Sequence, residues 1–288
     1  MNSYPTEKNR VLPGVLYLVA TPIGNLSDLS ERAVKVLSEV DFIAAEDTRN
    51  SMRLLSHAGI KKPMVSYFEH NKSERGEQIT ERLKGGESCA LITDAGMPAI
   101  SDPGEDIVAL CAKEGITVSA VPGPCAAVTA LALSGLPTGR FTFEGFLSAV
   151  KSQRRTALAE LSGEKRTMIF HEAPHKLRAT LSDMAEAFGA DRPISLCREL
   201  TKLNEEIYRT TLGEALKFYE SNEPRGEFVL VVGGATDSAG GAFWEKMTVE
   251  EHVLHYIEIG FSKNDAVKAA AKDRRVPKNE VYSKVLHL

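Results

Sequence analysis

Short apolar segments alternate with longer amphipathic segments over the first 121 residues, and this alternation limits the possible folds more than any other feature. The apolar segments, which we predict as strands, are residues 15–20, 41–46, 64–68, 89–93 and 116–121. The segments between them, which we predict as helices, are residues 29–40, 48–59, 73–86 and 104–115. Alternating strands and helices imply right-handed crossovers and a mostly parallel sheet with helices on both faces. We therefore predict an α/β fold.

A second α/β region follows a stretch rich in proline and glycine around Gly123. Five more strands are predicted at residues 141–147, 167–173, 193–200, 205–212 and 227–234, and helices at 151–162, 175–188 and 213–221. The last two strands are separated only by a helix and a turn, which favours a mixed sheet. We predict an N-terminal domain over residues 11–123 and a second domain over 124–235.

The remaining residues predict a small helical module over residues 244–288, joined through a linker of small residues at 236–243. Val249, Val253, Tyr256 and Ile257 share one face of its first helix. A capping box at Ser262 opens the second helix, and a proline precedes the third. Three short helices with sharp turns resemble a helix-turn-helix module.

The formal net charge of −4 taken alone argues against a nucleic-acid partner, but its distribution along the chain does not. From residue 260 onward, seven Lys and Arg residues stand against three Asp and Glu residues. A second basic cluster lies between Lys151 and Arg178. Each cluster alone is more typical of a solvated helix face, whereas two such clusters make a polyanionic partner about as probable as not.

Composition excludes several other classes of protein. A mean hydropathy of −0.17 and the lack of a long apolar run exclude a membrane-spanning helix. The N-terminal residues lack the layout of a secretory signal. The four cysteines have no CxxC spacing, which argues against a zinc site or a disulfide framework. These features predict a soluble, cytoplasmic protein without a metal.

Polar and glycine-rich turns follow the predicted strands of the first region, and they are the strongest sign of a binding site. They include ATPIGN after the first strand, AEDTRN after the second, FEHN after the third, TDAGMPAISDPG after the fourth and VPGPC after the fifth. The carboxyl ends of parallel strands meet at one edge of a sheet, where such folds bind ligands. A glycine in one such turn is more often structural, but five turns at one edge predict a cofactor cleft.

Several ordered motifs resemble those of the tetrapyrrole methylase superfamily. They are LVATPIGNLSDLSERAVKVL, AAEDTR, LITDAGMPAISDPG, VPGPCAAVTALALSGLPTGRF, FHEAPHKL and RELTKLNEE, and within the superfamily they are similar to the ribosomal RNA small subunit methyltransferase I group. The resemblance implies two α/β domains with S-adenosylmethionine in the cleft between them, and a homodimer. It implies methylation of a cytidine ribose 2′-hydroxyl in small-subunit (16S) ribosomal RNA, either as free RNA or within the 30S subunit.

The sequence leaves two alternative functions open. A methyltransferase acting on a tetrapyrrole would share the cofactor cleft, although the basic C-terminal residues fit it poorly. A non-enzymatic RNA-binding protein of ribosome assembly would have the basic surfaces without the cofactor loops.

The resemblance also implies roles for individual residues. Candidates for chemistry or substrate positioning are Asp47, Arg49 and Glu172. Candidates for cofactor binding are Pro22, Asp94, Gly96, Pro98, Ile100, Ala126, Phe170, Leu200, Glu227 and Phe228. The two basic clusters, rather than the resemblance, supply the candidates for RNA binding, which are Arg154, Arg155, Lys176, Arg178, Arg274, Arg275 and Lys278. Cys125 and His171 stand where the family more often has a hydroxyl residue and a tyrosine, so neither is among the candidates.

Overall fold

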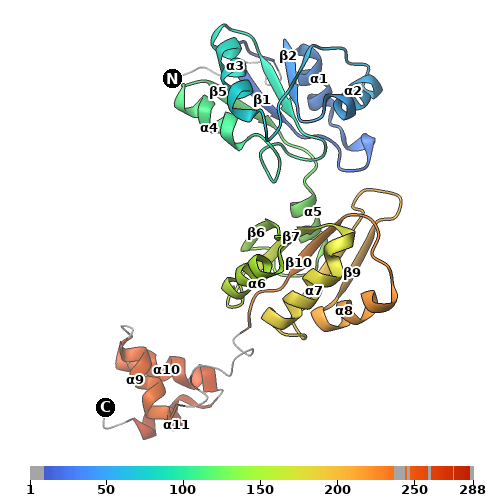
Figure 1. Cartoon of the computed structure of the whole chain (residues 1–288). Helices are drawn as coiled ribbons and strands as arrows, with labels where there is room; N and C mark the ends of the chain where they lie inside the picture. The colour runs from blue at the N-terminus through green and yellow to red at the C-terminus, as the bar shows by residue number, and fades with distance from the viewer. Residues whose placement is uncertain (1–9, 237–243, 245–246, 259–260, 275, 286–288) are drawn as a thin grey trace. The chain divides into compact units, whose positions relative to one another are not determined.

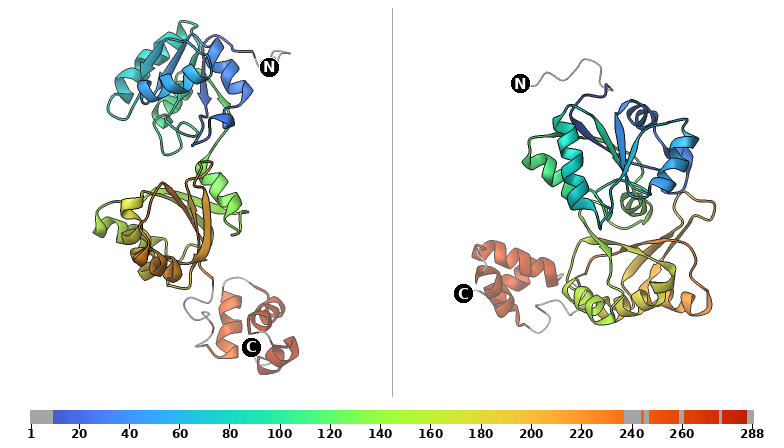
Figure 2. Two further views of the ribbon diagram at one scale, coloured as in Figure 1. Left: turned by 90° about the vertical axis from the view of Figure 1, so that its right-hand side faces the viewer. Right: turned by 45° about the horizontal axis from the view of Figure 1, so that its top comes forward.

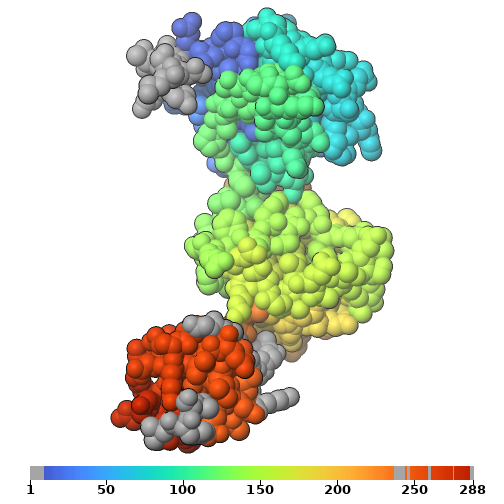
Figure 3. Space-filling model, turned by 90° about the vertical axis from the view of Figure 1, so that its left-hand side faces the viewer, coloured from blue at the N-terminus to red at the C-terminus, as the bar shows by residue number. Residues whose placement is uncertain are grey.

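The computed structural model describes residues 10–236, 244, 247–258, 261–274 and 276–285. The chain forms two compact units, Met1–Gly234 and Ala235–Leu288 (Figure 1). Residues 237–243 of the predicted linker, and Arg275 of the predicted RNA surface, lie outside the described residues. Each unit fills a continuous body of its own in the space-filling view (Figure 3).

The first sheet of the larger unit is parallel throughout, as the alternation of strands and helices predicts. Its strands are β1 (Val15–Val19), β2 (Phe42–Ala45), β3 (Met64–Ser66), β4 (Cys89–Ile92) and β5 (Thr117–Val121). They lie in the order β3-β2-β4-β1-β5, so β4 returns to a place between β2 and β1. This reversal brings the turns after β1 and β4 together in the middle of the sheet edge, which is where doubly wound folds bind ligands.

Alternate residues of these strands pack against helices on opposite faces of the sheet. One face contacts α1 (Glu31–Glu39) and α2 (Thr48–His57), and the other contacts α3 (Lys72–Lys84) and α4 (Glu105–Lys113). Tyr17 belongs to the first face and its neighbour Leu16 to the second. A strand buried on both faces has no polar side, which explains why its sequence is apolar without alternation.

The second sheet is mixed, as predicted. Its strands are β6 (Phe141–Phe146), β7 (Thr167–Glu172), β8 (Pro193–Arg198), β9 (Glu206–Thr211) and β10 (Phe228–Val232), in the order β6-β7-β10-β8-β9. Strand β6 runs parallel to β7, and the other pairs are antiparallel. Strand β10, the last in sequence, therefore lies at the centre of the sheet.

Helices cover both faces of this second sheet (Figures 1 and 2). Helices α6 (Lys151–Glu160), α7 (Pro174–Phe188) and α8 (Leu212–Ser221) pack on one face. Helix α5 (Ala126–Leu133), which follows the turn after β5, packs on the other face against Ile169, Val229 and Val231. Helix α5 thus links the edge of the first sheet to the second sheet. The division of this unit into domains at residue 123 stays a prediction.

The smaller unit contains α9 (Val249–Glu258), α10 (Lys263–Arg274) and α11 (Lys278–Lys284). Its core includes Val253, Ala266, Val267, Ala270 and Val281. Ser262 caps α10 as predicted, because its hydroxyl accepts from the backbone N–H of Asp265 at 3.3 Å. The predicted fold class is confirmed. No helix among the described residues is both long and apolar enough to cross a membrane.

Candidate functional site

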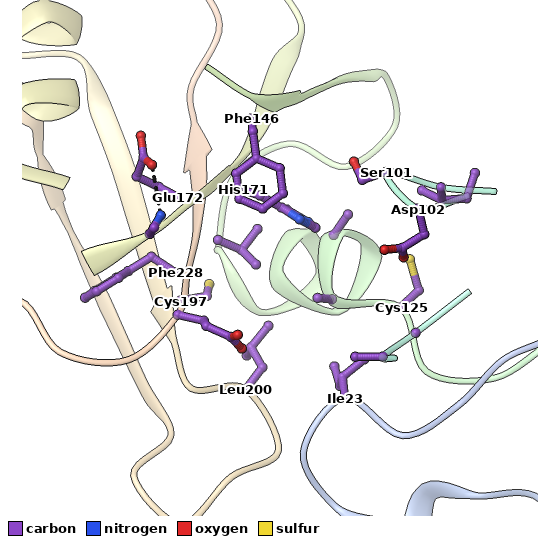
Figure 4. Close-up of a pocket in the computed structure, with 18 of the residues that line it drawn as sticks. Ile23, Ser101, Asp102, Cys125, Phe146, His171, Glu172, Cys197, Leu200 and Phe228 are labelled. Atoms are coloured by element: carbon purple, nitrogen blue, oxygen red, sulfur yellow. Dashed lines mark hydrogen bonds between the residues drawn. The ribbon is translucent and has the colours of Figure 1, made fainter. Parts of the chain in front are cut away.

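A cavity of the larger unit has a volume of about 460 Å³ and is lined by the loops that follow β1 and β4 of the first sheet, by the start of α5, and by strands and loops of the second sheet. We call it the inter-sheet cavity. Figure 4 shows Ile23, Ser101, Asp102 and Cys125 on one side of it, and Phe146, His171, Glu172 and Phe228 on the other. Its volume lies within the range of about 300–1,000 Å³ that is typical of small-molecule sites.

The turns after β1 and β4 are fixed to each other at the mouth of the first sheet. The backbone N–H of Thr21 donates to the Gly96 carbonyl at 2.9 Å, and that of Gly96 donates to the Thr21 carbonyl at 3.1 Å. The Thr21 hydroxyl also donates to the carbonyl of Thr93 at 3.1 Å. These bonds hold the loop of residues 93–104 as a rigid wall.

That same loop contains two of the four non-glycine residues with positive φ in the described part of the chain. Gly96 has a φ of +87°, and the non-glycine residues Ala99 and Ser101 have φ values of +68° and +61°. A Cβ at Gly104 would lie 3.0 Å from the backbone nitrogen of Ala99, so the loop tolerates no side chain there. Left-handed backbone at non-glycine residues costs free energy and is typical of binding loops.

His171 contributes an unpaired imidazole to the opposite wall. The rings of Phe143 and Phe146 approach it edge-on, each with its centroid 5.3 Å away. Burial lowers the pKa of His171, so the ring is neutral at neutral pH. Its Nε2 atom is buried and has no hydrogen-bond partner within the described part of the chain. A buried polar atom without a partner is costly unless a ligand supplies one.

Three carboxylates line the inter-sheet cavity, and two of them are occupied. Glu172 is 2% exposed; it accepts from the backbone N–H of Ala173 at 2.8 Å, from Lys176, and from the Thr180 hydroxyl. Glu227 pairs with Lys202 at 2.9 Å. Both occupied carboxylates therefore have structural partners.

Asp102 is the third carboxylate, and nothing in the described chain pairs with it through a hydrogen bond or an ion pair. Burial, helped by the negative charges of Glu46 and Asp94, raises the pKa of Asp102 to about 6. The group is therefore ionised at neutral pH but more basic than an ordinary aspartate. A half-buried carboxylate with a raised pKa in a cavity is typical of a general base.

Six of the ten predicted cofactor residues line the inter-sheet cavity, namely Gly96, Ile100, Ala126, Leu200, Glu227 and Phe228. Pro22, Asp94, Pro98 and Phe170 do not. Pro22 and Pro98 are buried, and Asp94 is exposed and accepts from the Asn50 side-chain amide at 3.0 Å. These four do not line the inter-sheet cavity, and their role in cofactor binding stays a prediction.

Phe170 and His171 are adjacent in β7 and face opposite sides of the sheet. Phe170 is fully buried among residues of α6 and α7, whereas its neighbour Ile169 packs with α5 on the other face. His171 shares the face of Ile169 because side chains alternate along a strand. The alternation of side chains along β7 is therefore the sequence signal that identifies His171, and not Phe170, as a residue facing the cavity.

Asp47 and Arg49 lie at the predicted sheet edge but do not line the inter-sheet cavity. The Asp47 side chain accepts from the backbone N–H of Arg49 at 2.8 Å, which caps α2 and lowers the pKa of Asp47. The Arg49 side chain is 87% exposed, with its Nε 3.5 Å from Asp47. Their geometry suits contact with a large substrate at the edge better than chemistry inside the cavity.

The sequence of the larger unit matches a known protein-family model. The model described as Tetrapyrrole (Corrin/Porphyrin) Methylases matches residues 15–216, a span that contains nine of the ten strands. The chain belongs to the tetrapyrrole methylase family. The loops that line the inter-sheet cavity up to Lys202 all fall within the matched residues.

Relatives of this methylase family member cover nearly the whole chain. A protein of Halalkalibacterium halodurans named "Ribosomal RNA small subunit methyltransferase I" is 48% identical over 98% of both chains. Proteins with the same name are 48% identical in Bacillus subtilis, over 93% of both chains, and 43% identical in Synechocystis, over 96% of this chain and 98% of the relative.

Solved structures share the fold at low sequence identity. A cobalt precorrin-4 methyltransferase has a TM-score of 0.57 at 18% identity, with 76% of this chain and 95% of that chain covered. A diphthine synthase has a TM-score of 0.57 at 14% identity, with 77% and 90% covered. These likenesses support the tetrapyrrole methylase fold of the larger unit.

Most of the predicted RNA-binding residues in the methylase unit already have protein partners. Arg154 is 5% exposed and donates to Asp183 through Nε at 2.8 Å. Arg178 donates to the Tyr219 carbonyl at 2.6 Å and so satisfies the end of α8. We withdraw Arg154 from the RNA surface, because a buried guanidinium paired with a carboxylate cannot neutralise a phosphate. Arg178 is exposed, and its role in RNA binding stays a prediction.

The other predicted RNA-binding cations differ in their exposure and in their protein partners. Lys176 pairs with Glu172 at 3.1 Å, and Arg155 is half-exposed and pairs with Asp183 at 2.9 Å. Arg274 donates to the carbonyls of Trp244, Met247 and Thr248, so it is also a structural residue and is withdrawn. Lys278 remains exposed, with a single bond to the Asn264 side chain at 3.3 Å.

Replacing Arg154 with Ala is expected to lower the free energy of unfolding of the larger unit by about 3–5 kcal/mol. The change removes the principal partner of Asp183, whose side chain is 3% exposed. Arg155→Ala is the matched control, because Arg155 also pairs with Asp183 but is 43% exposed, and its loss is expected to cost less than about 1 kcal/mol. Urea unfolding measures both; equal losses would contradict the structural role of Arg154.

Proposed function

We propose that this protein transfers a methyl group from S-adenosylmethionine to the ribose 2′-hydroxyl of a cytidine in small-subunit ribosomal RNA. The observation that carries the proposal is the 48% identity, over 98% of both chains, to a protein named as a methyltransferase of that RNA. The ribose oxygen and the cytidine follow from the resemblance of the motifs to that group.

The inter-sheet cavity has the donors and acceptors that S-adenosylmethionine requires. The first turn of α5 lacks a side-chain cap, so the backbone N–H groups of Ala126 and Ala127 suit the carboxylate of the cofactor. Glu227, which also pairs with Lys202, suits the amine of the cofactor. The unpaired Nε2 of His171 suits a hydrogen bond to the adenine, with Leu200 and Phe228 as apolar neighbours.

When bound, the cofactor supplies an electrophilic methyl group on a sulfonium, so the protein has to orient a hydroxyl and accept its proton. A ribose hydroxyl is a weak nucleophile at neutral pH. We assign the proton to a carboxylate oxygen of Asp102, because the other two carboxylates that line the cavity are occupied. Glu172 is accordingly withdrawn as a catalytic residue and holds the start of α7. The rigid loop of residues 93–104 keeps Asp102 in place, which supplies the required alignment.

RNA binding in this proposal uses exposed cations outside the cavity. Arg49 at the sheet edge suits a phosphate close to the reacting nucleotide. Lys272 and Lys278 are exposed on α10 and α11 of the smaller unit. Within the described residues Lys272 has no partner and Lys278 contacts only the neutral amide of Asn264, so contact with a phosphate would break no ion pair there.

Changing Lys272 and Lys278 together to Glu is expected to weaken binding to small-subunit RNA and to reduce the slope of log affinity against log salt by about two. The affinity for S-adenosylhomocysteine should stay unchanged. Lys61→Glu with Lys113→Glu is the matched control, because these lysines are exposed in the larger unit. Filter binding at several salt concentrations measures the slope; an RNA affinity equal to that of the control pair would contradict this RNA surface.

The experiment that tests the function offers methyl-labelled S-adenosylmethionine with three acceptors: 30S subunits, free small-subunit RNA and a porphyrinoid. Label in either RNA sample supports the proposal, and the stronger acceptor identifies the substrate form. Label in the porphyrinoid would support a tetrapyrrole methyltransferase instead. RNA binding without any transfer would support a non-enzymatic assembly protein.

Two further parts of the proposal concern assembly and location. We propose a homodimer in the cytoplasm, since the motifs resemble those of dimeric methylases and the cysteines are unpaired. Light scattering of the purified protein tests the dimer, and fractionation of the source cells tests the location.

A further inference from the structure

A second cavity of about 430 Å³ adjoins the inter-sheet cavity. It is lined by Ile23, Asp28, Gly123, Pro124, Cys125, Val128, Thr129 and Thr201. Ile23 and Cys125 line both cavities, so these two residues form the wall that the cavities share. An acceptor has to reach the reactive carbon of a cofactor in the first cavity, and the second cavity lies next to it.

Asp28 is available for a ligand because other residues cap the local helices. The Ser30 hydroxyl caps α1, because it accepts from the Ala33 N–H at 3.1 Å. The 3-10 turn Leu26–Asp28 is capped by Asn25, whose side chain accepts from Ser27 at 3.1 Å. The Asp28 carboxylate is exposed and pairs with no side chain in the described part of the protein.

The other walls of the second cavity suit a flat heterocycle. Pro124 and Val128 are apolar, and Val128 is 53% exposed on α5 although it belongs to a helix of entirely small and apolar residues, apart from Thr129. The Thr129 hydroxyl makes no hydrogen bond to any described residue. A carboxylate and the two hydroxyl residues Thr129 and Thr201 beside apolar side chains suit a site that reads a nucleobase edge.

We propose that the second cavity binds the base of the acceptor nucleotide and that Asp28 selects a base with an exocyclic amine, here cytosine. An ionised carboxylate only accepts hydrogen bonds, so it pairs with the N4 amine of cytosine. Uracil presents a carbonyl oxygen at the same position, which the carboxylate repels. Thr129 donates to the ring nitrogen or the O2 oxygen of the base. The inference rests on the proposed function and adds a specificity residue to it.

The test is Asp28→Asn, which keeps the shape of the side chain and replaces one acceptor oxygen with an amide NH2 donor. On reconstituted 30S subunits, we expect a loss of roughly ten- to a hundredfold in kcat/KM for the native cytidine. With uridine at the same position, activity should rise, because the new amide NH2 donates to the O4 carbonyl of uracil. The affinity for S-adenosylhomocysteine should not change, which excludes misfolding as the cause.

Asp191→Asn is the matched control, since Asp191 is exposed and lines neither cavity. A cytidine-to-uridine preference in Asp28→Asn equal to that of the control and wild type would overturn the assignment of the second cavity. If wild-type protein methylates no ribosomal RNA at all, the proposed function fails and the base site fails with it. If wild type methylates the RNA and only the preference is unmoved, the base site alone fails.

Discussion

Asp102→Asn is expected to lower kcat by roughly 10²–10⁴-fold while the affinity for S-adenosylhomocysteine stays near that of wild type. The asparagine keeps the size of the side chain but cannot accept a proton. Wild-type kcat should rise with pH through about 6 and level off above it, because only ionised Asp102 is a base. Steady-state kinetics measured from about pH 5 to about pH 8, a range that includes the pKa of Asp102, tests both effects.

Stability separates this loss of turnover from damage to the fold. Burial disfavours the charged form of Asp102, so its folded pKa lies above the unfolded one, and its contribution to stability falls as pH rises through about 6. Asp102→Asn should therefore unfold at the same or a higher temperature at pH 7.5. Glu46→Gln is the control, because removing that neighbouring charge should shift the activity midpoint to lower pH and leave the plateau intact. Wild-type kcat in Asp102→Asn would contradict the assignment.

Gly96→Val is expected to weaken S-adenosylmethionine binding by more than about a hundredfold. Gly96 has a φ of +87°, which a β-branched residue adopts only with strain. A Cβ at Gly96 would also lie 3.4 Å from the side chain of Ile23, at the wall shared by the two cavities. Isothermal titration calorimetry measures the loss of affinity.

Gly115→Val is the matched control for that strain. Gly115 has a φ of +70°, and a Cβ there would meet nothing within 4 Å. This variant should lose stability to a similar degree but bind the cofactor like wild type. Unchanged cofactor affinity in Gly96→Val, or an equal loss in Gly115→Val, would reject the role of the loop at residues 93–104.

The fold was predictable because its local patterns agree with its tertiary structure. The strands of the first sheet are buried on both faces, and their continuous apolar runs identify them. The order of the strands was not predictable in the same way. Nothing near Phe228 in the sequence indicates that β10 lies between β7 and β8, because this pairing depends on contacts between distant segments.

The candidate site was only partly predictable for a related reason. Turn composition located the loop containing Gly96, because glycine and proline constrain the backbone locally. Whether Glu172 or Asp102 is available as a base depends on residues elsewhere in the chain. Thr180 and Lys176 bind the carboxylate of Glu172, whereas no described residue binds that of Asp102. Counting charges along the sequence wrongly assigned Arg154 to the RNA surface, because the count does not show that Asp183 of another helix neutralises it.

The measurement that tests the central claim most directly locates the transferred methyl group within the nucleotide. Small-subunit RNA is labelled with methyl-labelled S-adenosylmethionine and hydrolysed in alkali, which needs a free 2′-hydroxyl to cleave the adjacent phosphodiester. Our account predicts label in an alkali-resistant dinucleotide that begins with 2′-O-methylcytidine. Label in a mononucleotide, which means a methylated base, would contradict it.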